Sequence, residues 1–261
     1  MTPAELAQRD ALDRLSRVHG EGGLRAAALA LVAEAGKAAA LHAWAQETED
    51  VASADAVQAD VGQLSPAARL PCLEALLDRV GALPKPERRV LLQATRRVMV
   101  AQVPARPVDR LVWLLMRRKL GDRPPVAAMP APQNDMSDLP AEMRQQIAAV
   151  TAHLSRLVPT GDSAAGLAWY RGVMGRFVPA DAMPPLEPPD GDRLARALEE
   201  VETLPWMLRP VLVRDWVDAA LTISERARLA PGAADALRLA AGLLDSPMPP
   251  ELARHYIELN W

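Results

Sequence analysis

The chain has 261 residues, half of them hydrophobic, and a formal net charge of −3, which is ordinary for a soluble protein. This length allows one large domain or two to three small ones, and the apolar share is enough to form a hydrophobic core. Six Trp, two Tyr and one Phe are the only aromatic residues, whereas Ala, Leu, Arg and Glu, which favour helix, are abundant. We therefore predict an all-α fold.

Cysteine content and hydropathy exclude further classes of protein. Cys72 is the only cysteine, so the chain can form neither an internal disulfide nor a cysteine-based metal cage, which is compatible with a reducing cytoplasm. The N-terminus has no charged-then-apolar signal pattern. The most apolar run, residues 24–44, is interrupted by Arg25, Glu34 and Lys37 and cannot form a membrane span. We expect a cytoplasmic protein without a transmembrane segment.

The first elements are expected to be helices separated by a glycine break. Residues 2–5 (TPAE) are a typical helix start, with Thr as the N-cap and Pro at the first helical position, and the helix should run to about residue 18. The glycine-rich residues 20–23 are expected to form an interhelical loop. A long Ala-rich helix should follow over residues 24–47, and then a short exposed helix within the acidic residues 47–60.

A helical hairpin and a third helix are predicted next. The first helix of the hairpin opens at Ser65-Pro66 and carries an apolar stripe, because Leu70, Leu73, Leu77 and Val80 follow one another at steps of three and four. The second helix should cover about residues 86–103. The third should cover about residues 108–120 and end at the glycine that follows.

Proline marks the expected domain boundary. Residues 122–140 are rich in proline and cannot form a regular element. We therefore predict an N-terminal helical domain over residues 1–121, a linker over 122–140 and a C-terminal helical domain over 141–261. Within the C-terminal domain, helical elements are expected over residues 141–157, 163–176, 193–221 (a hairpin), 232–244 and 250–259.

Two stretches of the chain have the pattern of the same helical hairpin. In each, an amphipathic helix runs into a Leu-Pro pair, Leu83-Pro84 or Leu204-Pro205, and a second helix starts behind it. This duplicated hairpin predicts a tandem architecture but supplies no chemistry. The positions of the first copy that recur 121 residues later are Leu73, Leu77, Val80, Leu83, Pro84, Arg88, Val90 and Leu91.

Residue types that carry catalysis or bind metals are not arranged in a recognised pattern. Residues 20–23 precede a helix as phosphate-binding glycines do, but no strand leads into them and no Lys-Ser/Thr follows. Cys72 lies in an apolar stretch that is typical of a small core residue rather than a nucleophile. Zinc hydrolysis needs two histidines one helical turn apart, and none of the four is so placed: His19, His42, His153 and His255. We expect no enzyme activity, metal or cofactor, with an enzyme of unrecognised type as an alternative.

The strongest charge feature is a basic segment, residues 85–119, with ten basic and two acidic residues. Its face can be a docking surface that binds an acidic partner or an anionic membrane. The other interpretation is a solvated face whose charge is balanced by the acidic residues 47–60. Trp113 is the only aromatic residue available to stack on bases, so no nucleic-acid partner is expected. Four arginines share one helix face and should be exposed: Arg88, Arg89, Arg96 and Arg97. Four neighbours should face the core: Val90, Leu91, Ala94 and Val98.

Tryptophan is unusually frequent for a chain with so few aromatic residues. Most of the six should anchor helix packing. Trp206, at a helix start, and Trp261, at the end of the chain, are candidates for an exposed contact surface. The full set is Trp44, Trp113, Trp169, Trp206, Trp216 and Trp261.

Several segments, in order, resemble the C-terminal region of bacterial HtpX-like membrane zinc metallopeptidases, which is a TerB-like (tellurite-resistance-type) helical module. Residues 65–76 (SPAARLPCLEAL) are similar to the start of that module. Residues 108–113 (VDRLVW) resemble its Ile-Asp-Leu-Phe-Glu-Trp signature, and residues 244–250 (LDSPMPP) resemble its closing Leu-Asp-Cys-Pro-Met-Pro-Pro. Residues 2–6 (TPAEL) resemble the segment that follows the peptidase domain.

The departures from that family limit what the resemblance implies. Its acidic Ala-Asp-Gly turn, which can hold a cation, is replaced by residues 104–106 (PAR) and 225–227 (ERA), and its signature glutamate is Val112. The peptidase motif and the transmembrane helices lie outside this chain. The resemblance therefore implies tandem TerB-like helical units and a non-catalytic protein-interaction or scaffold role, accessory to a membrane metallopeptidase. The alternative is a peripheral adaptor that uses the basic face.

Overall fold

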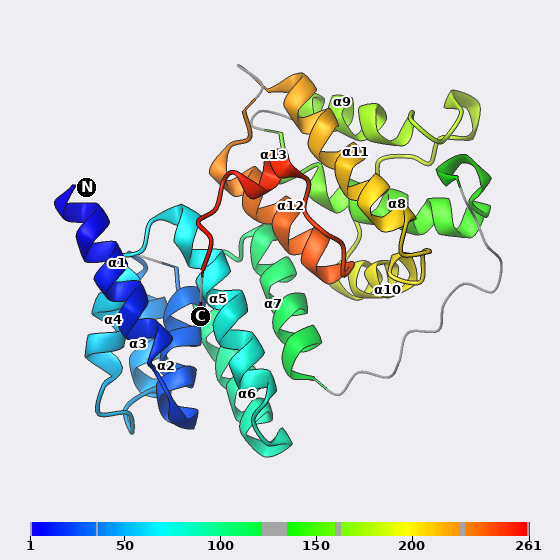
Figure 1. The fold of residues 1–261 in the computed structure, drawn as a ribbon. Helices are drawn as coiled ribbons and strands as arrows, with labels where there is room; N and C mark the ends of the chain where they lie inside the picture. The colour runs from blue at the N-terminus through cyan, green and yellow to red at the C-terminus, as the bar shows by residue number, and fades with distance from the viewer. Residues whose placement is uncertain (1, 35, 122–134, 160–162, 225–227, 260) are drawn as a thin grey trace. The chain divides into compact units, whose positions relative to one another are not determined.

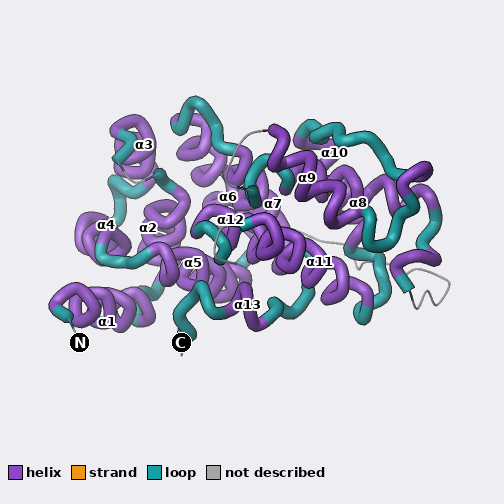
Figure 2. The backbone as a smooth tube through the Cα atoms, turned by 90° about the horizontal axis from the view of Figure 1, so that it is seen from above, coloured by secondary structure: helices purple, strands orange, loops and turns teal. Residues whose placement is uncertain are grey.

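The computed structural model describes residues 2–34, 36–121, 135–159, 163–224, 228–259 and 261 (Figure 1). Over these residues the fold is all-α, with 71% of them helical and no strand, which confirms the predicted fold class. Figure 2 shows helices joined by loops and turns throughout. No helix in the described ranges combines the length and the apolarity that a membrane crossing needs.

The chain forms two compact units, one made of Met1–Arg123 with Tyr256–Trp261 and the other of Pro124–His255. Of the predicted linker, residues 122–134 lie outside the described residues, and so do residues 225–227, one of the two replaced acidic turns. Residues 135–140 lie in the second unit and contain a short 3-10 helix, η1 (Met136–Asp138).

Seven helices make up the described part of the first unit. α2 lies at the centre of its core, because it packs against α3, α4, α5 and α6, while α7 packs against both α5 and α6. The bounds are α1 (Pro3–Ser16), α2 (Gly20–Val32), α3 (Ala38–Glu47), α4 (Ala54–Gly62), α5 (Pro66–Gly81), α6 (Lys85–Ala101) and α7 (Pro107–Leu120).

Six α-helices and two 3-10 helices lie in the described part of the second unit. α8 packs against α9 and α10, α9 packs against α11, and α11 packs against α12. The bounds are α8 (Ala141–Leu154), α9 (Ser163–Met174), the 3-10 helix η2 (Ala180–Ala182), α10 (Gly191–Val201), α11 (Leu208–Ile223), α12 (Pro231–Leu243) and α13 (Pro250–Ala253).

Helix starts follow the local sequence signals. A proline stands in the first turn of α1, α5, α7, α12 and α13, where its missing N–H costs no hydrogen bond. At α1 the predicted cap is a capping box. The Glu5 N–H donates to Thr2 Oγ1 at 3.2 Å, and the Thr2 N–H donates to the Glu5 carboxylate at 2.6 Å.

The two hairpins, α5–α6 and α10–α11, share four of their buried positions. Leu73, Leu77, Val80 and Leu91 are buried in the first, and their counterparts 121 residues later are buried in the second. Packing partners correspond as well, because α2, α3 and α7 pack on the first hairpin as α8, α9 and α12 pack on the second. The positions that would correspond to α1 lie largely outside the described residues, and those that would correspond to α4 contain the short 3-10 helix η2.

One of the repeated positions does not face the core as predicted. Val90 was expected to face the core, but it is 39% exposed, and its counterpart Val211 is 44% exposed. Both valines follow the arginine of the repeat by two residues and so lie about 200° away from it around the helix. Leu91, Ala94 and Val98 are buried as predicted.

The arginine shared by the two hairpins caps the C-terminal end of the helix that follows the hairpin, α7 in the first unit and α12 in the second. Arg88 Nη1 donates to the carbonyl oxygen of Leu120, the last residue of α7, at 3.3 Å. Arg209 Nη1 donates to the carbonyl oxygen of Leu244, the C-cap of α12, at 3.2 Å. A guanidinium satisfies carbonyls that no helical N–H can reach and opposes the negative end of the helix dipole. Arg88 is therefore half-buried, although the sequence predicted that it would be exposed.

The long helix predicted over residues 24–47 is wrong, because the chain forms two helices, α2 and α3, that pack against each other. Gly36 between them has a φ of +83°, which glycine adopts at no steric cost. Two contacts hold the break. The Trp44 indole N–H donates to the Ala26 carbonyl oxygen at 3.0 Å, and the Glu34 N–H donates to the side-chain oxygen of Gln102 at 2.6 Å.

The glycine loop predicted over residues 20–23 is also wrong, because these residues form the first turn of α2. Close packing explains two of the glycines. A Cβ at position 22 would lie 3.1 Å from Val51 Cγ2, and one at position 23 would lie 3.0 Å from Val18 Cγ1. The glycines therefore allow the side chains of Val51 and Val18 to pack close to α2, and they do not form a loop.

A proline inside α5 leaves a backbone carbonyl without its helical donor, and a residue near position 260 replaces that donor. Pro71 has no N–H, so the carbonyl of Ala67 lacks its usual helical donor. The Ile257 N–H donates to that carbonyl instead, at 3.2 Å. The helix predicted over residues 250–259 accordingly ends at Ala253, and residues 256–261 belong to the first unit.

Candidate interaction surfaces

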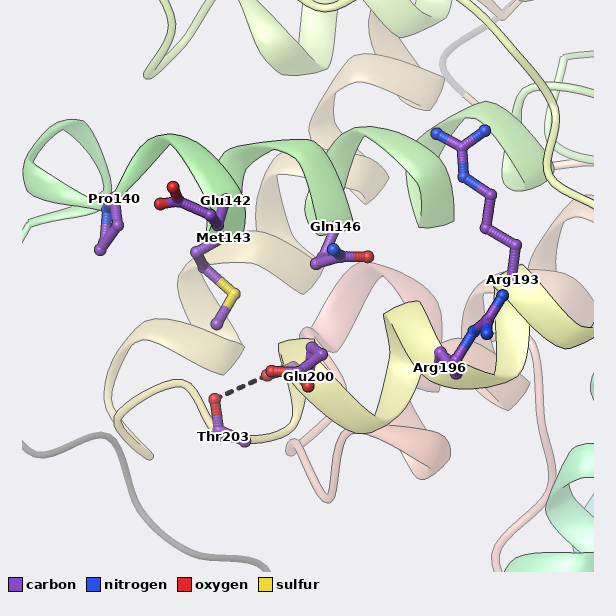
Figure 3. Close-up of a pocket in the computed structure, with 8 residues that line it drawn as sticks. All are labelled: Pro140, Glu142, Met143, Gln146, Arg193, Arg196, Glu200 and Thr203. Carbon is purple, nitrogen blue, oxygen red and sulfur yellow. Dashed lines mark hydrogen bonds between the residues drawn. The ribbon is translucent and has the colours of Figure 1, made fainter.

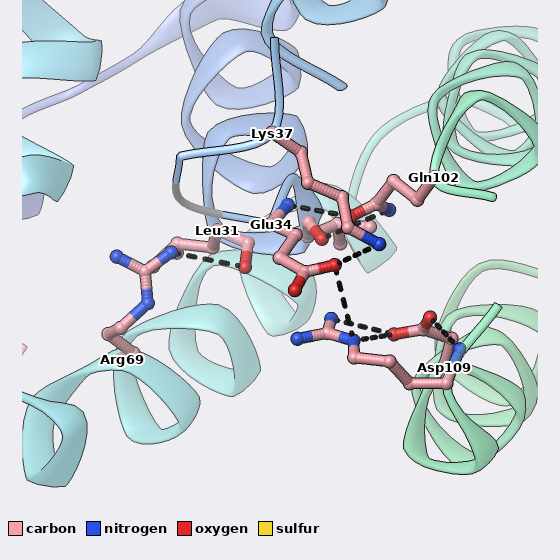
Figure 4. Close-up of polar contacts among 8 residues, drawn as sticks. Leu31, Glu34, Lys37, Arg69, Gln102 and Asp109 are labelled. Atoms are coloured by element: carbon pink, nitrogen blue, oxygen red, sulfur yellow. Dashed lines mark hydrogen bonds and ion pairs between the residues drawn. The ribbon is translucent and has the colours of Figure 1, made fainter. Parts of the chain in front are cut away.

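A polar cluster lies where the α2–α3 connection meets α6 and α7 in the first unit (Figure 4). The Glu34 carboxylate pairs with Lys37 Nζ at 2.8 Å and lies 3.7 Å from Arg106 Nε. Asp109, which is buried, accepts the backbone N–H of Arg106 at 2.8 Å and its guanidinium at 2.7 Å. Here the chain's own cations neutralise the carboxylates, so the cluster ties helices together.

Displaced pKa values also have structural causes. Burial raises the pKa of the Cys72 thiol and of the Tyr170 phenol to about 12 each. Burial also raises the pKa of Asp215, although Arg176 Nη1 lies 2.7 Å from its carboxylate. Within the described residues no three His, Cys, Asp or Glu side chains gather as metal ligands would. These groups stabilise helix packing and do not converge on a reacting centre.

The four arginines of the predicted basic face are not equivalent. Arg88 is half-buried against α7, whereas Arg89, Arg96 and Arg97 are exposed as predicted. Arg97 pairs with Glu47 on α3, with an Nη2–Oε2 distance of 2.7 Å. Hydrogen bonds from Arg97 hold the pKa of the Glu47 carboxyl below its ordinary value. Part of the basic charge is thus used within the first unit.

Charge reversal at two adjacent arginines of this face should distinguish an arginine that forms an ion pair from one that is only solvated. Arg97→Glu is expected to lower the free energy of unfolding by about 0.2–1 kcal/mol, because it removes an exposed pair and places like charge beside Glu47. Arg96→Glu, the matched neighbour, should change it by less than about 0.5 kcal/mol. Urea unfolding at low and at high salt measures both. Equal effects of the two reversals would show that the pair with Glu47 contributes nothing.

An exposed apolar surface lies at the connection between α10 and α11. Trp206 is 76% exposed, and Met207 and Val211 are each 44% exposed. We call these three residues the Trp206 surface. Met207 and Val211 were not predicted as part of it, because the helical periodicity of α11 alone does not separate them from core residues. Trp44, Trp169 and Trp216 are buried, as expected of packing anchors.

The second tryptophan candidate lies in the other unit. Trp261 is 40% exposed and belongs to the first unit with residues 256–261. The two candidates therefore do not share a surface within one unit.

A groove of about 660 Å³ runs between α8 and α10 in the second unit (Figure 3). Its charges are separated along its length. Figure 3 shows Glu142 and Glu200 toward one end, Arg193 and Arg196 toward the other, and Met143 between the helices. These residues were not predicted from the sequence. The lining residues of this α8–α10 groove are Pro140, Glu142, Met143, Gln146, Arg193, Arg196, Glu200 and Thr203.

Comparison of the chain with protein-family models, with curated proteins and with solved structures gives no match.

Proposed function

We propose that the chain is a non-catalytic helical module that binds a protein partner through the Trp206 surface. The observation that carries this proposal is the 76% exposure of Trp206 beside two further exposed apolar residues, Met207 and Val211. Leaving an indole in water forfeits one of the largest burial energies of any side chain, and tryptophan is enriched among the residues that dominate protein interfaces. The resemblance to the metallopeptidase C-terminal region makes a membrane peptidase the candidate partner.

Other parts of the chain support a contact role over catalysis. The displaced pKa values found at Cys72, Tyr170 and Asp215 accompany burial, and none of these residues lines the α8–α10 groove or the Trp206 surface. Catalytic groups with displaced pKa values normally converge in one cleft. The basic face supports the adaptor alternative less well, because Arg88 and Arg97 have partners within the first unit.

The test is the affinity of a purified partner for surface variants. The full chain, tagged, captures binding proteins from its native host, and the captured protein is purified and titrated against the chain. Trp206→Ser should weaken the complex by at least about tenfold, which is 1.4 kcal/mol. Val100→Ser with Val103→Ser is the matched control, because these exposed valines lie in the first unit.

Two results would contradict the proposal. One is a partner whose affinity is the same for wild type and Trp206→Ser. The other is a partner that is weakened by Arg89→Glu with Arg96→Glu and by added salt, which would favour the basic-face adaptor.

A further inference from the structure

An exposed pair of valines lies at the end of α6, where the chain turns into α7. Val100 is 67% exposed, and Val103, two residues beyond the end of α6, is 78% exposed. The latter is the highest exposure of any large apolar side chain in the described residues. The first unit therefore presents to water two apolar side chains that its own core does not use.

Arginines without a side-chain partner stand on both sides of this pair. Arg96 lies one turn before Val100 on the exposed side of α6, and Arg110 lies near the start of α7. Both are exposed, and neither guanidinium forms a hydrogen bond or an ion pair with another described residue. We call Arg96, Val100, Val103 and Arg110 the α6–α7 surface.

The carboxylates nearest to this surface in the fold already have cationic partners. Asp109, the only acidic residue between positions 96 and 120, is buried and accepts the guanidinium of Arg106. In the polar cluster of Figure 4, the Glu34 carboxylate pairs with Lys37. These carboxylates are therefore not available to neutralise the two arginines of the α6–α7 surface.

The acidic residues 47–60 do not balance these two arginines either. Among the described residues, Glu47 is the one member of that segment that pairs with the basic segment, and its partner is Arg97. Asp50 and Asp60 pair with arginines that lie outside the basic segment. The interpretation as a face whose charge is balanced within the chain therefore fails for the α6–α7 surface.

Exposed valines beside unpaired arginines fit the surface of an anionic membrane. Guanidinium groups are attracted to anionic headgroups, and apolar side chains beside them enter the boundary between headgroups and acyl chains. A bilayer adapts to a protruding pair of side chains, whereas a folded acidic protein needs a complementary apolar site. Nucleic acid would contact the arginines and leave the valines in water.

We propose that the α6–α7 surface binds an anionic lipid bilayer. Arg96 and Arg110 contact the headgroups, and Val100 and Val103 enter the layer beneath them. Binding is reversible and sensitive to salt, because this surface is much smaller than a full lipid anchor. The inference goes beyond the proposed function, since lipid contact in the first unit is separate from partner contact at the Trp206 surface.

The experiment is flotation of the full chain with phosphatidylcholine vesicles, with and without phosphatidylserine, at low and at high salt. The chain should bind the vesicles that contain phosphatidylserine, at low salt only. Arg96→Glu with Arg110→Glu should lower the partition coefficient by at least about tenfold. Arg9→Glu with Arg214→Glu is the matched control, because it changes the net charge equally at two exposed arginines elsewhere and should have little effect.

Val100→Ser with Val103→Ser tests the apolar part of the contact without a change of charge. It should lower the partition coefficient by at least about fivefold, because the valines no longer gain by leaving water. Circular dichroism of each variant checks that the helices are intact, which is expected since all substituted side chains are exposed.

Three results would overturn the inference. They are the absence of binding to phosphatidylserine vesicles at low salt, equal losses for the control reversal and the α6–α7 reversal, and a valine variant that binds like the wild type. Dependence on the arginines alone would point instead to a soluble polyanion. Trp206→Ser should bind vesicles like the wild type, so failure at this surface and failure of the proposed partner contact are distinguishable.

Discussion

Trp216→Ala is expected to destabilise the second unit by about 3–5 kcal/mol, the largest effect of any substitution considered for this chain. Trp216 is fully buried on α11, where its indole N–H donates to Thr151 Oγ1 at 3.1 Å. Its carbonyl oxygen accepts the indole N–H of Trp169 at 3.2 Å. Truncation would open a large cavity between α8, α9 and α11 and leave the buried Thr151 hydroxyl without this partner.

Urea unfolding followed by far-ultraviolet circular dichroism measures the effect. Trp206→Ala is the matched control, because it removes the same side chain from a site that is 76% exposed, and it should change stability by less than about 0.5 kcal/mol. Similar losses at the two positions would contradict the burial assigned to both tryptophans.

Alkylation of Cys72 is expected to be at least about a thousandfold slower in the folded chain than in the unfolded chain at pH 8. The side chain is fully buried, and burial raises the pKa of its thiol to about 12, so neither access nor thiolate is available. Iodoacetamide labelling read by mass spectrometry gives both rates, with the chain in guanidinium chloride as the unfolded control. Labelling at the unfolded rate without denaturant would show that the site opens freely.

The burial of Cys72 also determines how its contribution to the free energy of unfolding changes at alkaline pH. As pH rises, the unfolded chain loses the Cys72 proton first, because its thiol pKa is the ordinary one, 9.0, and the folded value is about 12. The unfolded state therefore binds fewer protons in this interval. The contribution of Cys72 to the free energy of unfolding should fall between about pH 9 and pH 12, and it should be constant below that range.

Local signals in the sequence predict most of the helices. Pro66 and Pro107 stand in the first turns of α5 and α7, and the apolar stripe of α5 is buried as its spacing indicates. These predictions succeed because capping and amphipathic periodicity act within one or two turns of the chain.

The break between α2 and α3 could not be predicted in the same way. Alanine-rich residues on both sides of it favour a continuous helix by propensity. The break is held instead by partners that are distant in sequence, since Gln102 accepts the Glu34 N–H and Trp44 returns to the carbonyl of Ala26. Tertiary contacts of this kind override local propensity and leave no local signature.

The candidate surfaces were predicted only in part. The exposure of Trp206 agrees with its position at a helix start, whereas Arg88 could not be recognised as a partner of the α7 carboxyl end from its own helix alone. The α8–α10 groove was missed because its charges look like any solvated helix face. Comparison of the two units reveals it, since Arg193 stands where the first unit buries Cys72.

The hydrogen bond from Ile257 to the carbonyl that Pro71 leaves open has a consequence for biosynthesis. A ribosome releases the chain from the N-terminus onward, and domains generally fold as they emerge. α5 therefore emerges long before its last donor is made, and the whole second unit is translated in between. The nascent first unit must keep the Ala67 carbonyl hydrated until residue 257 has left the exit tunnel, so this contact completes the first unit only after the second unit has been translated.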